Sequence, residues 1–331
     1  MFKSQWSQFF PPKPSFSETD IPSQAGKVFI VTGGYSGIGL ELVKVLYQKN
    51  ARVYIAGRSE EKASKAIEEI KASSSADVPS TASLEFLHLD LADLSTIKTS
   101  FETFKSKETK LHVLWNNAGV SQPPLGSLSK QGIDLQLATN CLGPFLFTQL
   151  LLPLLEHTAA ASSCPPGSVR VVWTASQMIE LSAPKGGIIM SEIHEPTKDV
   201  TRNYTNTKTG NFLLSAELAR RQQIGKESPV VSVSLNPGAA STNLFRHTPM
   251  LSYLAWPLLH EVKLAATTQL YAGLSEDITA EKNGCYVTPW GKVADHVRED
   301  LVEAGKPKEG GGNGRAQEFW EFCDDKTRSY L

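Results

Sequence analysis

The sequence has no marked excess of either positive or negative charge, and it has few cysteines. Its 331 residues carry a formal net charge of −1, and no basic stripe stands out along the chain. Because proteins that bind nucleic acid need clustered lysine and arginine, nucleic acid is not expected as a partner. The four cysteines lie far apart without C-x-x-C spacing. They indicate reduced intracellular thiols rather than a disulfide framework or a metal site.

Patterns for metal binding and for membrane insertion are also missing. The seven histidines are scattered and none belongs to an H-E-x-x-H pattern, so no metal is expected. The N-terminal stretch lacks the apolar core of a signal peptide. An apolar run broken by Pro257 is too short to span a bilayer, although it has the composition to lie on one. The sequence therefore predicts a cytoplasmic protein without a transmembrane segment.

The chain divides into a short arm and one long domain. Residues 1–25 contain Pro11, Pro12 and Pro14 among polar residues, which predicts an arm that is draped on the domain or left loose. Residues 26–331 are enough for one large domain or two ordinary ones. Strand and helix patterns alternate along them, which favours a single α/β domain.

The alternating pattern predicts a Rossmann-type, doubly wound parallel sheet flanked by helices, with ligands at the carboxyl ends of the strands. Strands are expected at Lys27–Val31, Arg52–Ala56, Leu84–Leu89, Leu111–Trp115, Val169–Thr174, Val230–Leu235 and Gly284–Val287. Helices are expected after the first strand, near Glu60–Lys71, Leu94–Phe104, Leu135–Glu156 and Asp199–Ile224, and around Phe319, Trp320 and Phe322, whose aromatic rings are expected to pack. Lys308 to Gly314 is expected to be flexible because it is rich in glycine.

A glycine-rich turn, Thr32 to Gly39, follows the first predicted strand and precedes a helical apolar face. Backbone N–H groups at a helix N-terminus bind phosphate, and glycine lets the ligand approach the chain. The spacing of Gly33, Gly37 and Gly39 is G-x-x-x-G-x-G, which differs from the common G-x-G-x-x-G fingerprint. The turn predicts a pyrophosphate site, although alone it is also compatible with an ordinary tight turn.

A tyrosine and a lysine lie four residues apart in the helix predicted over Asp199–Ile224, so Tyr204 and Lys208 share one face. A free tyrosine titrates near ~10, and a nearby ammonium favours the phenolate. We therefore expect Lys208 to lower the pKa of Tyr204 and to suit it for proton exchange. Alone, this spacing is also that of an exposed pair with no role.

Taken in order, these motifs resemble those of short-chain dehydrogenases/reductases with a catalytic Asn-Ser-Tyr-Lys set. The resemblance is greatest to retinol-dehydrogenase-like and WW-domain-oxidoreductase-like members, especially fungal ones. It covers the chain from about Lys27 to the end. It rests on Thr32 to Gly39, Asp90-Leu91, Asn116 to Gly119, Asn140 with Gly143, Ser176, Tyr204 with Lys208, and Asn236-Pro237-Gly238.

The resemblance implies a role for each motif. Tyr204 would exchange a proton, Ser176 would hold the substrate oxygen, Lys208 would bind the nicotinamide ribose, and Asn140 would carry a water that relays protons. The implied cofactor-binding residues are Gly33, Tyr35, Ser36, Gly37, Ile38, Gly39, Arg58, Asp90, Leu91, Asn117, Ala118, Gly119, Tyr204, Lys208, Pro237, Gly238 and Thr242. Many family members have two adjacent serines where this chain has Thr174-Ala175-Ser176, so only Ser176 is available.

The end of the second predicted strand bears on the choice of cofactor. NAD-binding proteins usually have an acidic residue there, whereas an arginine can receive the 2′-phosphate of NADP. This chain has Arg58 and no acid before Glu60, which favours NADP(H). The alternative is a solvated Arg58 that pairs with Glu60 or Glu61.

Two segments are expected to bound the substrate. Residues 238–262 form the implied substrate loop, whose apolar residues favour a lipophilic carbonyl compound or fit a buried helix of the fold. Met178–Lys198 is expected to form part of the pocket wall, and residues 292–331 a helical extension. The loop's apolar residues are Leu244, Phe245, Met250, Leu251, Tyr253, Leu254, Trp256 and Leu258.

The sequence thus predicts an NADP(H)-dependent carbonyl reductase or alcohol dehydrogenase that acts on a lipophilic or polyketide-like small molecule of secondary metabolism, possible as a homodimer. The alternatives are an NAD-dependent alcohol dehydrogenase of the same family and a non-catalytic NADP-binding regulatory protein. The intact set of Asn140, Ser176, Tyr204 and Lys208 argues against the regulator. A sugar-nucleotide epimerase would usually carry a G-x-x-G-x-x-G turn, which this chain lacks.

Overall fold

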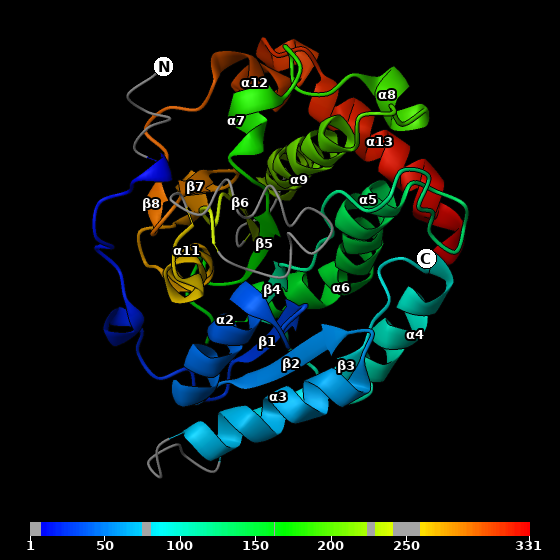
Figure 1. Ribbon diagram of the computed structural model, residues 1–331. Coiled ribbons are helices and arrows are strands. Elements are labelled where there is room, and N and C mark those ends of the chain that lie inside the picture. Colours follow the sequence, from blue (N-terminus) through cyan, green and yellow to red (C-terminus); the bar gives the residue numbers. More distant parts are fainter. Residues whose placement is uncertain (1–7, 75–80, 162, 224–228, 241–258) are drawn as a thin grey trace.

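The computed structural model of the chain describes residues 8–74, 81–161, 163–223, 229–240 and 259–331 (Figure 1). Its strands form one eight-stranded sheet in the order β3-β2-β1-β4-β5-β6-β7-β8. The strands are β1 (Val28–Thr32), β2 (Arg52–Gly57), β3 (Ser83–His88), β4 (Val113–Asn116), β5 (Arg170–Thr174), β6 (Val231–Leu235), β7 (Tyr286–Thr288) and β8 (Lys292–Val293). All pairs are parallel except β7 with β8. The seven predicted strands are confirmed, but β8 was missed because two residues carry no periodicity.

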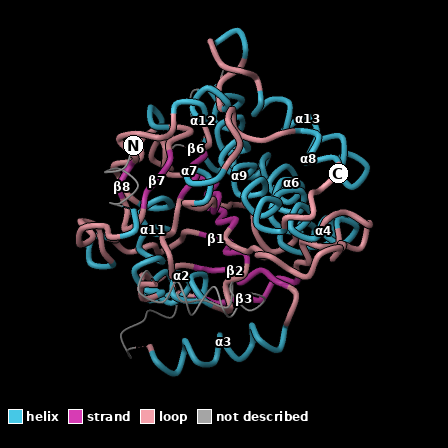
Figure 2. The backbone as a smooth tube through the Cα atoms, turned by 45° about the horizontal axis from the view of Figure 1, so that its top comes forward, coloured by secondary structure: helices cyan, strands magenta, loops and turns pink. Residues whose placement is uncertain are grey.

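Helices cover both faces of the sheet (Figure 2). One face carries α2 (Gly37–Gln48), α3 (Glu60–Ser73) and α11 (Val262–Leu274). The other face carries α4 (Leu94–Lys105), α6 (Gly143–Ala159) and α9 (Val200–Gln223). Each face buries its own apolar core, so the predicted doubly wound, Rossmann-type fold is confirmed.

The remaining elements are short or C-terminal. The short helices are α5 (Leu135–Leu137), α7 (Met178–Ser182), α8 (Met190–His194) and α12 (Glu299–Ala304), the 3₁₀ turns are η1 (Glu18–Asp20), η5 (Ala280–Lys282), η6 (Lys308–Gly310) and η7 (Arg328–Tyr330), and one π turn is η2 (Ala138–Leu142). Helix α13 (Arg315–Thr327) packs outside α9 and α6 (Figure 1). Its Phe319 and Trp320 are buried, and Trp320 meets Phe145 edge to face, which confirms the expected packing.

The glycine-rich stretch before α13 differs from the flexible segment expected from the sequence. The backbone N–H groups of Gly312, Asn313 and Gly314 donate to the carbonyl groups of Pro307, Glu303 and Lys306. Gly311 and Gly314 have φ angles of 77° and 76°, which only glycine adopts readily. The glycines therefore form a tight turn that is held by backbone hydrogen bonds.

One stretch, Leu135–Ala159, is long and apolar enough to cross a membrane by length and composition. It comprises α5, η2 and α6, and 67% of its most apolar window is buried inside the fold. A helix in the core of a doubly wound fold has this same composition, so the stretch is not a clear membrane span.

The contact between α11 and β4 supports the centre of the sheet. Trp115 on β4 is fully buried and its indole N–H donates to the carbonyl of Gln269 at 2.9 Å. A β-carbon on Gly273, one turn along α11, would lie 2.1 Å from the Trp115 ring. Gly273 is therefore required by close packing and not by its backbone angles.

We expect Gly273→Ala to lower the free energy of unfolding by about 2 kcal/mol, because the added methyl group overpacks against Trp115. Helix propensity alone predicts the opposite sign, a gain of roughly 1 kcal/mol. Denaturant unfolding distinguishes the two, and Trp115→Phe combined with Gly273→Ala should recover part of the loss. An unchanged or stabilised single variant would contradict the packing argument.

Candidate functional site

The glycine-rich turn joins the end of β1 to the first turn of α2. Gly33 and Gly37 have φ angles of 68° and 54°, a region that side chains disfavour. A β-carbon on Gly39 would lie 2.5 Å from the carbonyl oxygen of Gly33. Ser36 is the N-cap of α2, and its side chain makes no capping hydrogen bond. The turn thus brings free N–H groups of a helix N-terminus close to the surface, as phosphate binding requires.

The ends of the neighbouring strands continue this edge. The ring of Tyr35 covers Gly57 at the end of β2, since a β-carbon on Gly57 would lie 2.3 Å from that ring. The next residue, Arg58, is exposed, and within the described residues no hydrogen bond or ion pair joins it to Glu60 or Glu61. After β3, the Asp90 carboxylate accepts the N–H of Ala92 at 2.9 Å. The predicted residues that follow β1, β2 and β3 therefore lie together at the carboxyl ends of these parallel strands.

Hydrogen bonds join the end of β1 to the residues that follow β4. The hydroxyl oxygen of Thr32 accepts the backbone N–H groups of Asn117 and Ala118 at 3.0 and 2.9 Å. The Asn117 side chain also donates to the carbonyl of Thr32. Gln269 of α11, fully buried, donates to Asn117 and to the Thr174 hydroxyl. Sequence reasoning missed Gln269, whose only signal was one amide in the apolar stretch that becomes α11.

Ser176, Tyr204 and Lys208 come together where β5 meets α9. Ser176 lies near enough to Tyr204 for its hydroxyl to lower the pKa of the tyrosine. The Lys208 Nζ lies 5.8 Å from the centre of the Tyr204 ring and donates to the carbonyl of Thr174 at 2.9 Å. All three residues are at least partly buried, so the alternative of an exposed Tyr-Lys pair is wrong.

Asn140 is the fourth predicted catalytic residue, and it lies in the π turn η2. Its amide oxygen accepts the N–H of Val120 at 2.8 Å, and its amide group donates to the Val120 carbonyl and to the Thr207 hydroxyl. A β-carbon on Gly119 would lie 3.2 Å from the Asn140 oxygen and 3.4 Å from the Lys208 Nζ. Because both amide hydrogens are used, the side chain fixes the Gly119-Val120 backbone beside Lys208.

The electrostatics of the pair differ from the sequence expectation. Burial raises the pKa of Tyr204 to about 12, while the nearby Ser176 hydroxyl acts in the opposite direction. Burial also lowers the pKa of Lys208 to about 8. Desolvation thus dominates the pKa of Tyr204, and the group that opposes it is Ser176 rather than Lys208. The spacing in the sequence showed that the two residues share one face of the helix, but it did not show that this face is buried away from solvent.

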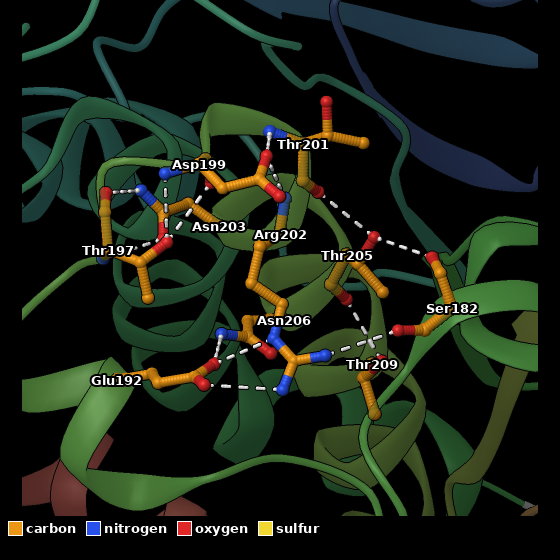
Figure 3. Close-up of polar contacts among 10 residues, drawn as sticks. All are labelled: Ser182, Glu192, Thr197, Asp199, Thr201, Arg202, Asn203, Thr205, Asn206 and Thr209. Atoms are coloured by element: carbon orange, nitrogen blue, oxygen red, sulfur yellow. Dashed lines mark hydrogen bonds and ion pairs between the residues drawn. The ribbon is translucent and has the colours of Figure 1, made fainter.

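The segment expected to form a pocket wall is fastened to the start of α9 (Figure 3). Arg202 and Asn206 both donate to Glu192 of α8, at distances of 2.8 to 3.2 Å. The hydroxyl groups of Ser182 and Thr205 are 3.1 Å apart. Arg298, just before α12, donates to four carbonyl groups of α7 and the residues after it. Residues 178–198 are thus held against the tyrosine-bearing helix from two sides.

Within the part of the chain that the structure describes, neither the implied substrate loop, nor a metal site, nor a surface hollow adds a residue to the catalytic candidates. Thr242 and most of the implied substrate loop, including its apolar residues, lie outside the described residues. Across the described ranges, no group of three or more His, Cys, Asp or Glu residues has the geometry to hold a metal ion. A surface hollow of about 430 Å³ lies between α6, α9 and α13, away from the catalytic candidates.

The buried lysine makes stability depend on pH. The folded pKa of Lys208, about 8, is below its ordinary value of 10.5, so the unfolded chain binds more protons between these values. The free energy of unfolding of the wild type should therefore rise with pH relative to Lys208→Met, by about 1 kcal/mol between pH 7 and 9. Denaturant unfolding at both pH values measures this difference. A constant or falling difference would show that Lys208 stays charged in the fold.

Comparison with known proteins places the chain in a family. A family profile described as short chain dehydrogenase matches residues 27–249. The chain is 43% identical over 331 residues to the short-chain dehydrogenase/reductase iacJ of Pestalotiopsis fici, with 98% of each chain covered. It is 45% identical over 335 residues to a short-chain dehydrogenase/reductase of Phomopsis amygdali, with 99% of this chain and 98% of that one covered.

A solved structure shares the fold. It is a 3-oxoacyl (acyl-carrier-protein) reductase of Agrobacterium tumefaciens with NADP bound, with a TM-score of 0.61 and 19% identity over 83% of this chain and 97% of that chain. The relatives and the matched profile confirm the resemblance seen in the motifs. The chain therefore belongs to the short-chain dehydrogenase/reductase family, whose members are oxidoreductases that bind a nicotinamide cofactor and act on alcohol or carbonyl groups.

Proposed function

We propose that this protein is an NADP(H)-dependent oxidoreductase that interconverts a lipophilic ketone or aldehyde and the corresponding alcohol. The observation that carries the proposal is the buried pair of Tyr204 and Lys208 beside Ser176, at the carboxyl ends of the strands where the glycine-rich turn also lies. Residues 26–331 form the catalytic domain in this proposal, with residues 292–331 as a helical extension that braces the segment after Ser176.

Each catalytic candidate has one task. When bound, the cofactor supplies or accepts the hydride. The Tyr204 hydroxyl donates its proton to the oxygen of the carbonyl compound, or takes it back in the reverse direction. Ser176 donates a hydrogen bond to that same oxygen and so stabilises the developing negative charge. Lys208 would hold the cofactor ribose, while Asn140 positions the backbone of Gly119 and Val120.

The pKa of Tyr204 fits the reducing direction better than the oxidising one. A hydroxyl with a pKa of about 12 is fully protonated at neutral pH, so it is ready to donate. Oxidation of an alcohol needs the phenolate, which this dry environment disfavours. Reduction of a carbonyl compound is therefore the favoured direction in the proposal.

The choice of NADP(H) is supported by the exposed end of β2. Arg58 follows the strand directly, and the first acidic residues, Glu60 and Glu61, lie inside α3. A guanidinium with no ion pair to these acids has its donors available for a 2′-phosphate. The apolar sequence after Gly238 supports a lipophilic substrate, such as a polyketide-like compound of secondary metabolism.

Removal of the Tyr204 hydroxyl tests the catalytic assignment. Tyr204→Phe should leave folding and the dissociation constant for NADPH nearly unchanged and should lower kcat by ~10²- to 10⁴-fold, because the proton donor is lost. The assay is NADPH-dependent turnover of a panel of ketones. A folded variant that binds NADPH and turns over at a near-normal rate would contradict the assignment, and absence of turnover in the wild type would favour a regulator.

Reversal of the charge at position 58 tests the cofactor. Arg58→Asp should weaken NADPH binding about ten- to a hundredfold, since a charge-assisted hydrogen bond contributes roughly 1.5–3 kcal/mol. Use of NADH should hold steady or improve, because NADH lacks the 2′-phosphate. The measurement is kcat/KM for both cofactors in wild type and variant. A wild type that prefers NADH, or a ratio that the substitution leaves unchanged, would overturn the NADP assignment.

A further inference from the structure

The N-terminal arm enters the molecule next to the proposed active site. The Gln8 side chain is only 4% exposed, although its neighbours in sequence are polar or aromatic residues of an arm. Its amide nitrogen donates to the Glu180 carboxylate at 3.1 Å, and its amide oxygen accepts the Asn236 amide at 2.9 Å. Glu180 lies on α7, four residues after Ser176, and Asn236 follows β6. One arm residue thus joins two elements that are 56 residues apart in the chain.

The hydrogen-bonded chain continues to Gly238. The side-chain oxygen of Asn236 accepts the backbone N–H of Gly238 at 3.0 Å. Asn236 is buried, so it has little water to replace these partners. Gly238 thus donates to Asn236, Asn236 donates to Gln8, and Gln8 donates to the Glu180 carboxylate.

A second route from the arm reaches the same glycine. The carbonyl oxygen of Phe9 is 2.8 Å from His260 Nε2, and the His260 ring meets the Trp290 ring edge to face at 5.1 Å. A β-carbon on Gly238 would lie 3.0 Å from the Trp290 ring. Trp290 has a φ angle of 69°, a strained value for a bulky residue that the surrounding packing must maintain.

Both routes therefore end on the turn that carries Pro237 and Gly238. Gly238 itself has a φ angle of 86° and is held on one side by a hydrogen bond and on the other by an aromatic ring. Resting on the proposed function, we propose that Gln8 is a positioning residue: it locks the Pro237-Gly238 turn to the helix that follows Ser176, and so sets the distance between cofactor and substrate.

The burial of Glu180 explains why an arm residue can do this. Glu180 is 5% exposed, and burial raises the pKa of its carboxyl, whereas the hydrogen bond from Gln8 lowers it. A buried carboxylate that loses its donor must shift or bind water. Gln8 thus stabilises the position of α7 as well as that of the turn, and a displacement of either one misaligns hydride and proton transfer.

The first test removes both hydrogen bonds of Gln8 and keeps its size. Gln8→Met should lower the single-turnover rate of hydride transfer from saturating NADPH by about tenfold or more, since small misplacements are costly. The dissociation constant for NADPH should rise by less than the rate falls, because most of the expected cofactor contacts lie at the glycine-rich turn and only two, Pro237 and Gly238, lie on the turn that moves. Ser17→Ala is the matched control, because it removes a capping box on the same arm and should leave the rate unchanged. A rate for Gln8→Met that equals the control rate overturns the proposal.

A readout without cofactor separates this proposal from the proposed function. In the enzyme alone, Gln8→Met should raise hydrogen exchange in a peptide spanning Val231–Ala240 by about tenfold or more, and Ser17→Ala should not. Unchanged exchange overturns the proposal even if the enzyme is active. Absence of hydride transfer in the wild type, together with raised exchange in the variant, contradicts the proposed function and leaves the positioning contact supported.

A paired substitution guards against a variant that fails to fold. Gln8→Glu places two carboxylates against each other, so hydride transfer should fall by more than about tenfold. With Glu180→Gln added, the amide on α7 can donate to the new carboxylate at position 8, and that carboxylate can still accept the Asn236 amide. The double variant should recover most of the rate. A double variant that is no faster than Gln8→Glu alone would show that the two residues do not act through their contact.

Discussion

The carbonyl oxygen of Thr174, at the end of β5, fixes α9, which carries two of the proposed catalytic residues, to the sheet. It accepts both the Lys208 ammonium and the Asn211 amide, at 2.9 and 3.0 Å, so two residues of α9 are tied to one atom of the central sheet. The hydroxyl of the same residue accepts Gln269 from α11 on the opposite face. Because Ser176 follows two residues later, the position of α9 relative to Ser176 depends on this strand end.

That constraint explains why a polar helix can be buried. Most residues of α9 between Asn203 and Ser215 are buried, and many of them carry amide or hydroxyl groups. Some of these groups bind carbonyls one turn earlier in α9, and others bind side chains outside the helix: Thr207 accepts from Asn140, and the amide nitrogen of Asn206 donates to Glu192. The helix is thus fixed in rotation as well as in place, because a rotated helix would leave several buried polar groups unpaired.

Burial has a chemical consequence as well as a structural one. It keeps Tyr204 protonated and moves the pKa of Lys208 down to about 8, close to neutrality. A dry site strengthens each hydrogen bond to a developing charge, but it also opposes formation of the phenolate. In the proposed reaction, the same desolvation that favours proton donation by Tyr204 makes proton removal from an alcohol harder.

The sequence by itself determined the alternation of strands and helices, the glycine-rich turn and the order of the motifs. These are local features, since periodicity and glycine conformation act over a few neighbouring residues. Only the tertiary structure decided that Lys208 is dry, that Asn140 uses its side chain on Val120, and that Gln269 and Gln8 belong beside the site. Those outcomes depend on partners that lie tens to hundreds of residues apart, and solvation and hydrogen bonding across such distances leave no pattern in the sequence.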